Sequence, residues 1–252
     1  MGRLEGRVVI VTGAAQGLGA VYARALASEG AKICVSDLES GGSVVDQIRS
    51  DGGEAIDIIS DVSSEEACEN MVAQTLKNFG HVDVLVNNAA IFTAVERKTF
   101  DKISVDEWDR MHAVNVRGTW LCCKAVVPEM RKNRYGKIIN ISTSRFFQGV
   151  PFFLHYDATK GAVIGITRGL SKELGEDNIC VNAIAPGSTL SENVKKRTNW
   201  MGSGKAAQLS NRAIKREQLP DDLVGSVIFL ASAESDFITG QTLLIDGGIS
   251  AH

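Results

Sequence analysis

The sequence has few of the features that mark metal-binding, secreted or membrane proteins. Its five cysteines form no Cys-x-x-Cys pair and have no histidine at ligand spacing, so we expect buried free thiols and no metal site. No apolar run is long enough to span a bilayer, and the first residues, Met-Gly-Arg-Leu-Glu, lack the apolar core of a secretory signal. These absences favour a cytoplasmic protein in a reducing compartment.

Excess positive charge and proline are also lacking. Lys and Arg together number 27 against 30 Asp and Glu, which gives a net charge of -3. This balance creates no positive potential for nucleic acid or an anionic membrane, so we expect neither partner and instead a small-molecule substrate. The chain has four prolines and no Pro/Gly/Ser-rich linker, so residues 1–252 are predicted to form a single domain.

Short runs of β-branched and apolar residues recur along the chain, with longer amphipathic segments between them. The runs cover residues 7–12, 31–36, 82–87, 137–142, 180–184 and 242–245. They are apolar on both faces, as the strands of a parallel sheet are when helices cover each side. The pattern predicts an α/β protein with a Rossmann-like, doubly wound parallel sheet.

Two segments depart from this alternation. Residues 100–131 are predicted to form one long helix that begins at Asp101 or Ser104. Residues from about 190 to 218 are polar and weakly periodic, which is typical of a mobile segment beside a site. We expect this second segment to act as a substrate lid.

A glycine-rich turn follows the first predicted strand and opens a helix. Its glycines have the spacing G-x-x-x-G-x-G. Gly13 permits a tight turn, Gly17 lets the backbone approach a pyrophosphate, and Gly19 allows close helix packing. The helix N-terminus adds free N–H donors. We therefore predict a dinucleotide site that also includes Gln16 and Leu18.

An acidic residue ends the second predicted strand. Asp37 lies eighteen residues beyond Gly19, where its carboxylate can accept hydrogen bonds from the hydroxyls of the adenosine ribose. A 2′-phosphate would meet a negative charge there, and neither Gln16 nor Leu38 offers a positive one. The sequence therefore predicts NAD as the cofactor.

A phenol and an ammonium are spaced for joint chemistry. Tyr156 and Lys160 are four residues apart and so share one face of a helix. A tyrosine with an ordinary pKa of about 10 is a poor base at neutral pH, but a neighbouring cation and the positive nicotinamide ring favour the phenolate and lower that pKa. The spacing alone also suits an ordinary surface pair.

The pair does not stand alone, however. The glycine turn, the Asn87 to Ala90 motif, Asn115, the Ile141 to Thr143 motif and Pro186-Gly187 occur with it in a fixed order. In this combination the chain resembles the short-chain dehydrogenase/reductase family, from Leu4 to the Asp246-Gly247-Gly248 ending.

The resemblance implies a catalytic tetrad of Asn115, Thr143, Tyr156 and Lys160. Tyr156 would be the base in alcohol oxidation and the acid in ketone reduction. Lys160 would lower its pKa and hold the nicotinamide ribose, and Asn115 would support a water that links Lys160 to solvent. Tyr156 and Lys160 would therefore also contact the cofactor, together with Asp61, Val62, Asn88, Pro186, Gly187, Thr189 and Ser191.

The family's serine position is occupied by threonine. The usual spacing of thirteen residues before Tyr156 leads to Thr143, with Ser142 and Ser144 on either side. A threonine hydroxyl has the same donor and acceptor capacity. We favour Thr143, because Gly149 and Pro151 then keep their family places, although a shift of one residue would select a neighbouring serine instead.

The loop between Thr143 and Tyr156 is rich in phenylalanine. We expect Thr143, Phe147, Phe153 and Tyr156 to contact an aromatic or alicyclic substrate, although the phenylalanines could equally pack in the core or at a subunit contact. Arg145 lies on the same loop, which should border the site, and could pair with an anionic group on the substrate.

These inferences predict an oxidoreductase that transfers a hydride between NAD and a secondary alcohol or ketone. One alternative is an NADH-dependent reductase of a carbonyl compound, with or without an anionic group. A non-catalytic NAD-binding regulator is the other, and it would be expected to lack Tyr156 or Lys160. The family resemblance also implies a homotetramer.

Overall fold

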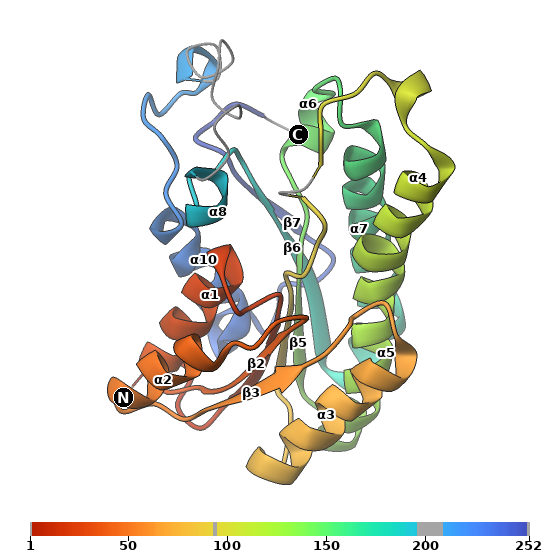
Figure 1. The fold of residues 1–252 in the computed structure, drawn as a ribbon. Helices are drawn as coiled ribbons and strands as arrows, with labels where there is room; N and C mark the ends of the chain where they lie inside the picture. The colour runs from red at the N-terminus through yellow and green to blue at the C-terminus, as the bar shows by residue number, and fades with distance from the viewer. Residues whose placement is uncertain (1, 93–94, 196–208, 251–252) are drawn as a thin grey trace.

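The computed structural model describes residues 2–92, 95–195 and 209–250, and it contains a seven-stranded sheet in the order β3-β2-β1-β4-β5-β6-β7. Every neighbouring pair is parallel (Figure 1). The strands are β1 (Val8–Thr12), β2 (Lys32–Asp37), β3 (Ala55–Ile59), β4 (Val84–Asn87), β5 (Gly136–Ile141), β6 (Ile179–Pro186) and β7 (Thr242–Ile245).

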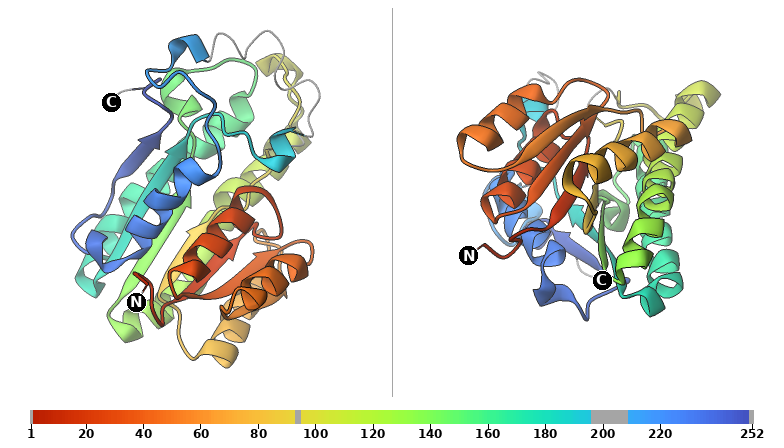
Figure 2. Two further views of the ribbon diagram at one scale, coloured as in Figure 1. Left: turned by 90° about the vertical axis from the view of Figure 1, so that its left-hand side faces the viewer. Right: turned by 90° about the horizontal axis from the view of Figure 1, so that it is seen from below.

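Helices cover both faces of this sheet, and each interface is an apolar core (Figures 1 and 2). One face packs against α1 (Gly17–Ser28), α2 (Gly42–Ser50) and α10 (Asp221–Ala231). The other packs against α3 (Glu65–Phe79), α5 (Thr119–Asn133) and α7 (Leu154–Glu173). All five cysteines are buried and free. Within the described ranges, no helix combines the length and apolarity needed to cross a membrane.

The predicted doubly wound fold is confirmed. Each of the six predicted runs contains a strand, and the strand ends differ from the predicted ones by at most two residues. The central strands are buried along their whole length, which explains their continuous apolar sequence. Strand order reverses between β1 and β4, and a ligand crevice forms at the carboxyl ends of the strands at such a point.

Of the two predicted starts of the long helix over residues 100–131, the structure has the one at Ser104. A separate short 3-10 turn, Phe100–Lys102, precedes the helix, which begins with α4 (Val105–His112) because Ser104 and Glu107 form a capping box. The helix then continues through a π-helical stretch, Ala113–Gly118, before α5. Such stretches frequently accompany functional sites.

A buried amide network ties the sheet to α7. The Asn87 side chain donates to Asn140 Oδ1 at 2.9 Å, across the register at which these two residues pair. The Asn140 amide donates to Thr167 Oγ1 on α7 at 2.9 Å. All three side chains are buried, so each of these two hydrogen bonds gives a partner to a polar atom that water cannot reach. The network fixes the carboxyl ends of β4 and β5 relative to α7.

We predict that Asn140→Ala lowers the free energy of unfolding by about 2 to 4 kcal/mol, since it leaves buried partners on β4 and α7 unsatisfied. Chemical denaturation would measure this loss. Asn133→Ala is the control, because Asn133 is exposed and bonds only to Glu129 in the described structure, and it should cost no more than about 0.5 kcal/mol. Equal losses in the two variants would contradict the role of the network.

Candidate active site

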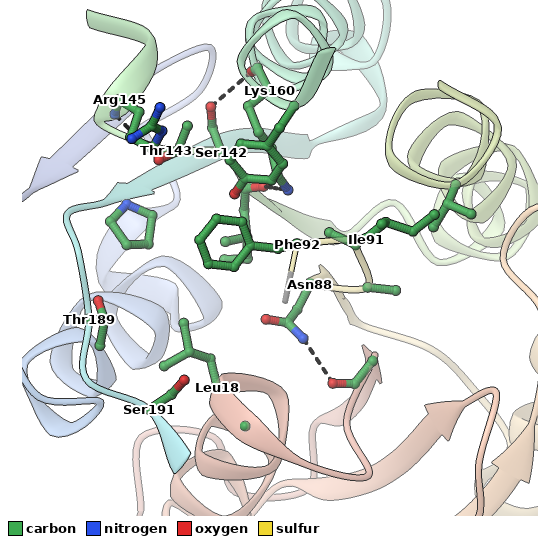
Figure 3. Close-up of a pocket in the computed structure, with 18 of the residues that line it drawn as sticks. Leu18, Asn88, Ile91, Phe92, Ser142, Thr143, Arg145, Lys160, Thr189 and Ser191 are labelled. Atoms are coloured by element: carbon green, nitrogen blue, oxygen red, sulfur yellow. Dashed lines mark hydrogen bonds between the residues drawn. The ribbon is translucent and has the colours of Figure 1, made fainter. Parts of the chain in front are cut away.

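A cavity of about 480 Å³ runs along the carboxyl ends of the strands. Figure 3 shows Lys160 and Thr143 toward one end, Leu18 and Ser191 toward the other, and Phe92 between them. Most of the predicted site residues line this cavity, namely Gly13, Gln16, Gly17, Leu18, Asp37, Asp61, Val62, Asn88, Thr143, Arg145, Tyr156, Lys160, Pro186, Gly187, Thr189 and Ser191. Four do not: Gly19, Asn115, Phe147 and Phe153.

The glycine turn is built for close approach of a ligand. Gly13 and Gly17 have positive φ angles of 62° and 60°, a region that side chains disfavour. A Cβ at Gly19 would lie 2.1 Å from the Gly13 carbonyl oxygen, so Gly19 lets α1 pack behind the turn. The Asn88 amide donates to the carbonyls of Thr12 and Gly13 at 3.0 and 2.9 Å. The turn fits a pyrophosphate held by backbone N–H groups.

Asp37 lies at the end of β2, beside this turn. Its carboxylate accepts hydrogen bonds from the backbone N–H of Ala15 at 2.9 Å and of Leu38 at 2.7 Å, which fixes its position at the cavity wall. Leu38 lines the same part of the cavity and is 61% exposed. An apolar surface beside a carboxylate is suited to an adenosine with free ribose hydroxyls.

Two further wall segments come from the ends of β3 and β6. Asp61 is held in its loop by bonds from the Ser63 backbone and hydroxyl, and Val62 packs next to Gly118. Beyond β6, the Thr189 hydroxyl donates to the Gly187 carbonyl at 3.1 Å.

The segment predicted as a lid starts and ends beside the site. The Leu190 backbone donates to Gln218 at 2.8 Å, and α8 (Glu192–Lys195) follows Ser191. Residues 196–208 of the predicted lid lie outside the described residues.

Tyr156 and Lys160 lie on the first turns of α7 and face the cavity. Both are buried, with 6% and 3% of their surface exposed. The Lys160 ammonium donates to the Ile141 carbonyl at 2.6 Å and lies 5.9 Å from the centre of the Tyr156 ring. Burial lowers the pKa of Lys160 to about 8, because the charged form loses its hydration.

The expected lowering of the Tyr156 pKa does not occur in the protein alone. Burial raises this pKa above its usual value, and the neighbouring Asp157 carboxylate adds to the rise. The Arg145 guanidinium and a hydrogen bond from the Thr143 hydroxyl act in the opposite direction, and they are weaker than burial. The predicted lowering rests on a neighbouring cation and on the nicotinamide ring, and burial of the phenol opposes both.

The three hydroxyls at the end of β5 are used differently. Ser142 donates to the backbone carbonyl of Lys160 at 2.9 Å, and Ser144 accepts a bond from the Gln148 amide at 2.9 Å. Thr143 accepts a bond from the Arg145 backbone N–H at 3.3 Å, lines the cavity with Tyr156, and lowers the pKa of the Tyr156 phenol. Of the three hydroxyls, Thr143 is therefore the one favoured as the partner of Tyr156, which agrees with the family spacing.

Asn115 lies behind the cavity, in the π-helical stretch. Its side chain accepts from the Ile91 backbone at 2.8 Å and donates to Thr159 Oγ1 at 3.1 Å. The first contact fixes the loop after β4, and the second reaches α7 between Tyr156 and Lys160. The direct contacts in the structure thus give Asn115 a positioning role.

The predicted aromatic wall requires correction. The Phe147 ring packs edge-on against Phe146, with centroids 5.2 Å apart, and Phe153 is buried in the apolar cluster that also contains Tyr156. Neither lines the cavity, because the short helix α6 (Arg145–Gln148) and the turn after it direct both rings elsewhere. Phe92 takes this place, with its ring 4.8 Å from that of Tyr156.

Besides Phe92, the cavity has other apolar lining residues that the sequence did not indicate. The cavity is also lined by Ile91, Val114, Val150, Val194 and Ile249. The signal for Ile91 and Phe92 was their place directly after the Asn87 to Ala90 motif, at the carboxyl end of β4.

Arg145 lines the cavity but is engaged within the chain. Its guanidinium forms a two-pronged ion pair with Asp157, at 3.1 Å for each contact, and donates to the Val150 carbonyl at 3.1 Å. The contacts leave it poorly placed to bind an anionic substrate, because most of its donors already have acceptors.

Known proteins resemble the chain over nearly its whole length. The sequence profile of a family described as enoyl-(acyl carrier protein) reductase matches residues 13–250. The chain is 35% identical over 250 residues to a probable galactose dehydrogenase of Rhizobium meliloti, with 98% of this chain and 96% of that protein covered. It is 36% identical over 254 residues to cyclopentanol dehydrogenase of Comamonas sp., with 100% of both covered.

The fold is also shared with solved structures. A short-chain type dehydrogenase/reductase from Mycobacterium marinum superimposes with a TM-score of 0.89 at 29% identity, covering 99% of this chain and 97% of that one. Agreement in sequence, in fold and in the order of the site motifs shows that the protein belongs to the short-chain dehydrogenase/reductase family and is an oxidoreductase that acts on an alcohol or ketone.

Proposed function

We propose that the protein is an NAD-dependent dehydrogenase of a secondary alcohol on an alicyclic or aromatic ring, with reduction of the ketone as the reverse reaction. The observation that carries the proposal is the single cavity that brings Tyr156 and Thr143 together with Asp37 and the glycine turn. One part of this cavity suits a dinucleotide, and the other offers two hydroxyls to a substrate oxygen.

The reacting proton is handled by Tyr156. In oxidation the deprotonated Tyr156 oxygen takes the proton of the alcohol hydroxyl, and in reduction the protonated phenol returns a proton to the ketone oxygen. Thr143 donates a hydrogen bond to the substrate oxygen, while the Arg145 backbone N–H occupies its acceptor side. Bound NAD would accept the hydride and bring a positive ring whose field favours the phenolate.

Lys160 acts through its charge and its place behind Tyr156. Its ammonium is held by the Ile141 carbonyl, and its field favours the phenolate of Tyr156. An ammonium in this position would also donate to the nicotinamide ribose. Asn115 holds the Ile91 backbone so that the loop carrying Phe92 keeps its place beside the ring of Tyr156.

The cavity wall supports a ring-shaped apolar substrate. Phe92 presents apolar surface beside Tyr156, Val150, Val194 and Ile249 add apolar side chains to the cavity wall, and such walls select by shape. One relative is named cyclopentanol dehydrogenase, and cyclopentanol is an alicyclic alcohol, which supports this substrate class. The relative named for galactose implies a polar ring, which makes ring shape the shared property.

An NADH-dependent reductase of a carbonyl compound is the second candidate, because the same residues serve both directions. A non-catalytic regulator is disfavoured, since Tyr156 and Lys160 are both present in the cavity. The homotetramer stays a prediction. It is supported by two exposed apolar side chains, Phe237 in the turn before β7 and Leu243 on this edge strand, and light scattering would measure it.

The test of this function is NAD-linked turnover, followed by NADH absorbance. We expect cyclopentanol and cyclohexanol to be oxidised with a kcat/KM at least about 10-fold above that of an acyclic secondary alcohol with the same number of carbons. Tyr156→Phe should lose about 100-fold or more, because it removes the group that exchanges the proton. Wild-type turnover that survives in Tyr156→Phe would rule out the proposed role.

The cofactor preference depends on Asp37. Asp37→Asn removes the negative charge that a 2′-phosphate would meet, so kcat/KM for NADP relative to NAD should rise at least about 10-fold. Steady-state kinetics with both cofactors would measure this ratio. Asp46→Asn, at an exposed position on α2, is the control and should leave the ratio unchanged. A wild-type preference for NADP would contradict the proposal outright.

The catalytic hydroxyl can be assigned with four variants. Thr143→Ala should lower kcat about 100-fold through loss of a hydrogen bond to the reacting oxygen, and Thr143→Ser should restore most of the activity. Ser142→Ala and Ser144→Ala are the matched controls, since each neighbouring serine is bonded to another part of the chain. A near-normal Thr143→Ala enzyme together with an inactive Ser142→Ala enzyme would reverse the assignment.

A further inference from the structure

An ion pair links the two elements that carry the catalytic hydroxyls. Arg145 follows β5 two residues after Thr143, and Asp157 follows Tyr156 directly on α7. The Arg145 Nε and Nη2 atoms donate to the two Asp157 carboxylate oxygens, at 3.1 Å each. Two parallel bonds between a planar guanidinium and a carboxylate fix orientation as well as distance.

The surroundings hold this pair in place. Both side chains are only 15% exposed, so water screens the interaction weakly. The guanidinium lies over the Phe153 ring, 4.6 Å from its centre, and its Nη2 also bonds to the Val150 carbonyl. These contacts connect α6 and the turn after it to the start of α7.

The same arginine reaches Thr143 through its backbone. Its N–H donates to the Thr143 hydroxyl oxygen at 3.3 Å, so the hydroxyl proton is directed to another acceptor. The Thr143 hydroxyl in turn lowers the pKa of the Tyr156 phenol, and both side chains line the same cavity. Arg145 therefore contacts one catalytic hydroxyl directly, and its side chain holds the residue next to the other.

The two charges also act on Tyr156 in opposite senses. The Asp157 carboxylate raises the pKa of the Tyr156 phenol, and the Arg145 guanidinium lowers it. Asp157 is itself partly buried, and burial raises its own pKa while Arg145 lowers it. Removal of one partner alone would leave the other charge uncompensated in a poorly hydrated place.

We propose that the Arg145–Asp157 ion pair is a positioning device of the active site that sets the distance between Thr143 and Tyr156 and balances the electric field at the Tyr156 oxygen. Neither residue exchanges a proton or holds the substrate. The inference rests on the proposed function, since it assigns these residues to the proton transfer at Tyr156.

Other groups around Tyr156 have to be kept constant in the test. Lys160 on α7 and Thr143 after β5 both face the ring. On the helix side, His155 lies next to Tyr156, and its pKa is lowered, first by burial. The Lys98–Glu107 pair and His112 act on His155 and are unchanged in the variants below, whereas Asp157, which raises the pKa of His155, is removed in two of them.

The experiment compares Asp157→Asn, Arg145→Met, the double variant and Arg145→Lys. The rising limb of kcat/KM against pH in alcohol oxidation should move to lower pH in Asp157→Asn, where an unpaired cation favours the phenolate. It should move to higher pH in Arg145→Met, where an unpaired carboxylate opposes it. On the limb, each shift should change the rate relative to its plateau roughly three-fold, as a displacement of half a pH unit does.

The remaining two variants separate charge from geometry. The double variant should return the limb to the wild-type pH but keep a lowered plateau, because the tether between α6 and α7 is gone. Arg145→Lys keeps the charge and loses the two-pronged contact, so its limb should stay in place while its plateau falls. Arg131→Met and Asp177→Asn are the controls, because they remove an exposed ion pair at the opposite end of α7.

A spectroscopic readout makes the test independent of turnover. The chain has three tyrosines, so carbon-13 labelling of the tyrosine rings gives three signals, and Tyr156→Phe identifies the one of interest. In protein saturated with NAD, the titration of the Tyr156 signal should move in the same two opposite directions as the kinetic limb. The signals of Tyr22 and Tyr135 serve as internal references.

The outcomes distinguish two kinds of failure. If wild type shows no NAD-linked turnover, or Tyr156→Phe remains active, the proposed function fails, and the tyrosine signals still report whether the pair acts on Tyr156. If Tyr156→Phe is inactive but Asp157→Asn and Arg145→Met shift neither limb nor signal, or shift both in one direction, the pair has only a structural role and the inference is overturned.

Discussion

The side-by-side pairing of β4 and β5 is the constraint on which the site depends most. Asn87 and Asn140 face each other in register, and their amide contact is buried. Because Asn140 also bonds to Thr167, the same contact fixes α7 and with it Tyr156. The loop after β4 and the loop after β5 therefore open on one cavity. The catalytic groups meet there because parallel strands end at a common edge, and the sequence order alone would not bring them together.

Much of this arrangement can be predicted from the sequence, because its signals are local. Continuous apolar runs indicate buried parallel strands, and the glycine turn keeps its spacing in any chain that folds in this way. Spacing on a helix indicates Tyr156 and Lys160, the family resemblance adds Thr143, and all three line the cavity. The family and the acceptance of an alcohol or ketone follow from the comparisons as well.

The rest depends on the direction in which each side chain points, which spacing does not determine. Phe147 and Phe153 lie in the expected loop, but a short helix and the turn after it direct their rings away from the cavity. Phe92 lies on another loop and takes their place. Arg145 was expected to pair with an anionic group on the substrate. In the structure its partner is Asp157, which is twelve residues away in the sequence and is brought close only by folding. Non-local contacts of this kind have no pattern in the sequence.

Burial also changes the balance of charge in a way that spacing cannot reveal. Loss of hydration raises the pKa of Tyr156 and lowers that of Lys160, so both side chains are driven toward their neutral forms. A phenolate in this site therefore needs positive charge nearby, and the local ion pair contributes almost no net charge because its members have opposite signs. Under the proposed function, the phenolate fraction of Tyr156 would depend on Lys160 and on the positive ring of a bound cofactor, which would couple proton transfer to cofactor occupancy.

The internal hydrogen bonds have a consequence for the choice of substrate. Around the reacting position, Ser142, Ser144 and Asn115 are bonded to other parts of the chain, and Arg145 is paired with Asp157. Among the described residues nearest to Tyr156, this leaves the hydroxyls of Tyr156 and Thr143 for a single substrate oxygen. An apolar wall discriminates weakly between substrates that differ by one carbon. A polar substituent on the substrate would find few hydrogen-bond partners there. Under the proposed function, selection by this site should therefore depend on the shape of the ring that carries the alcohol.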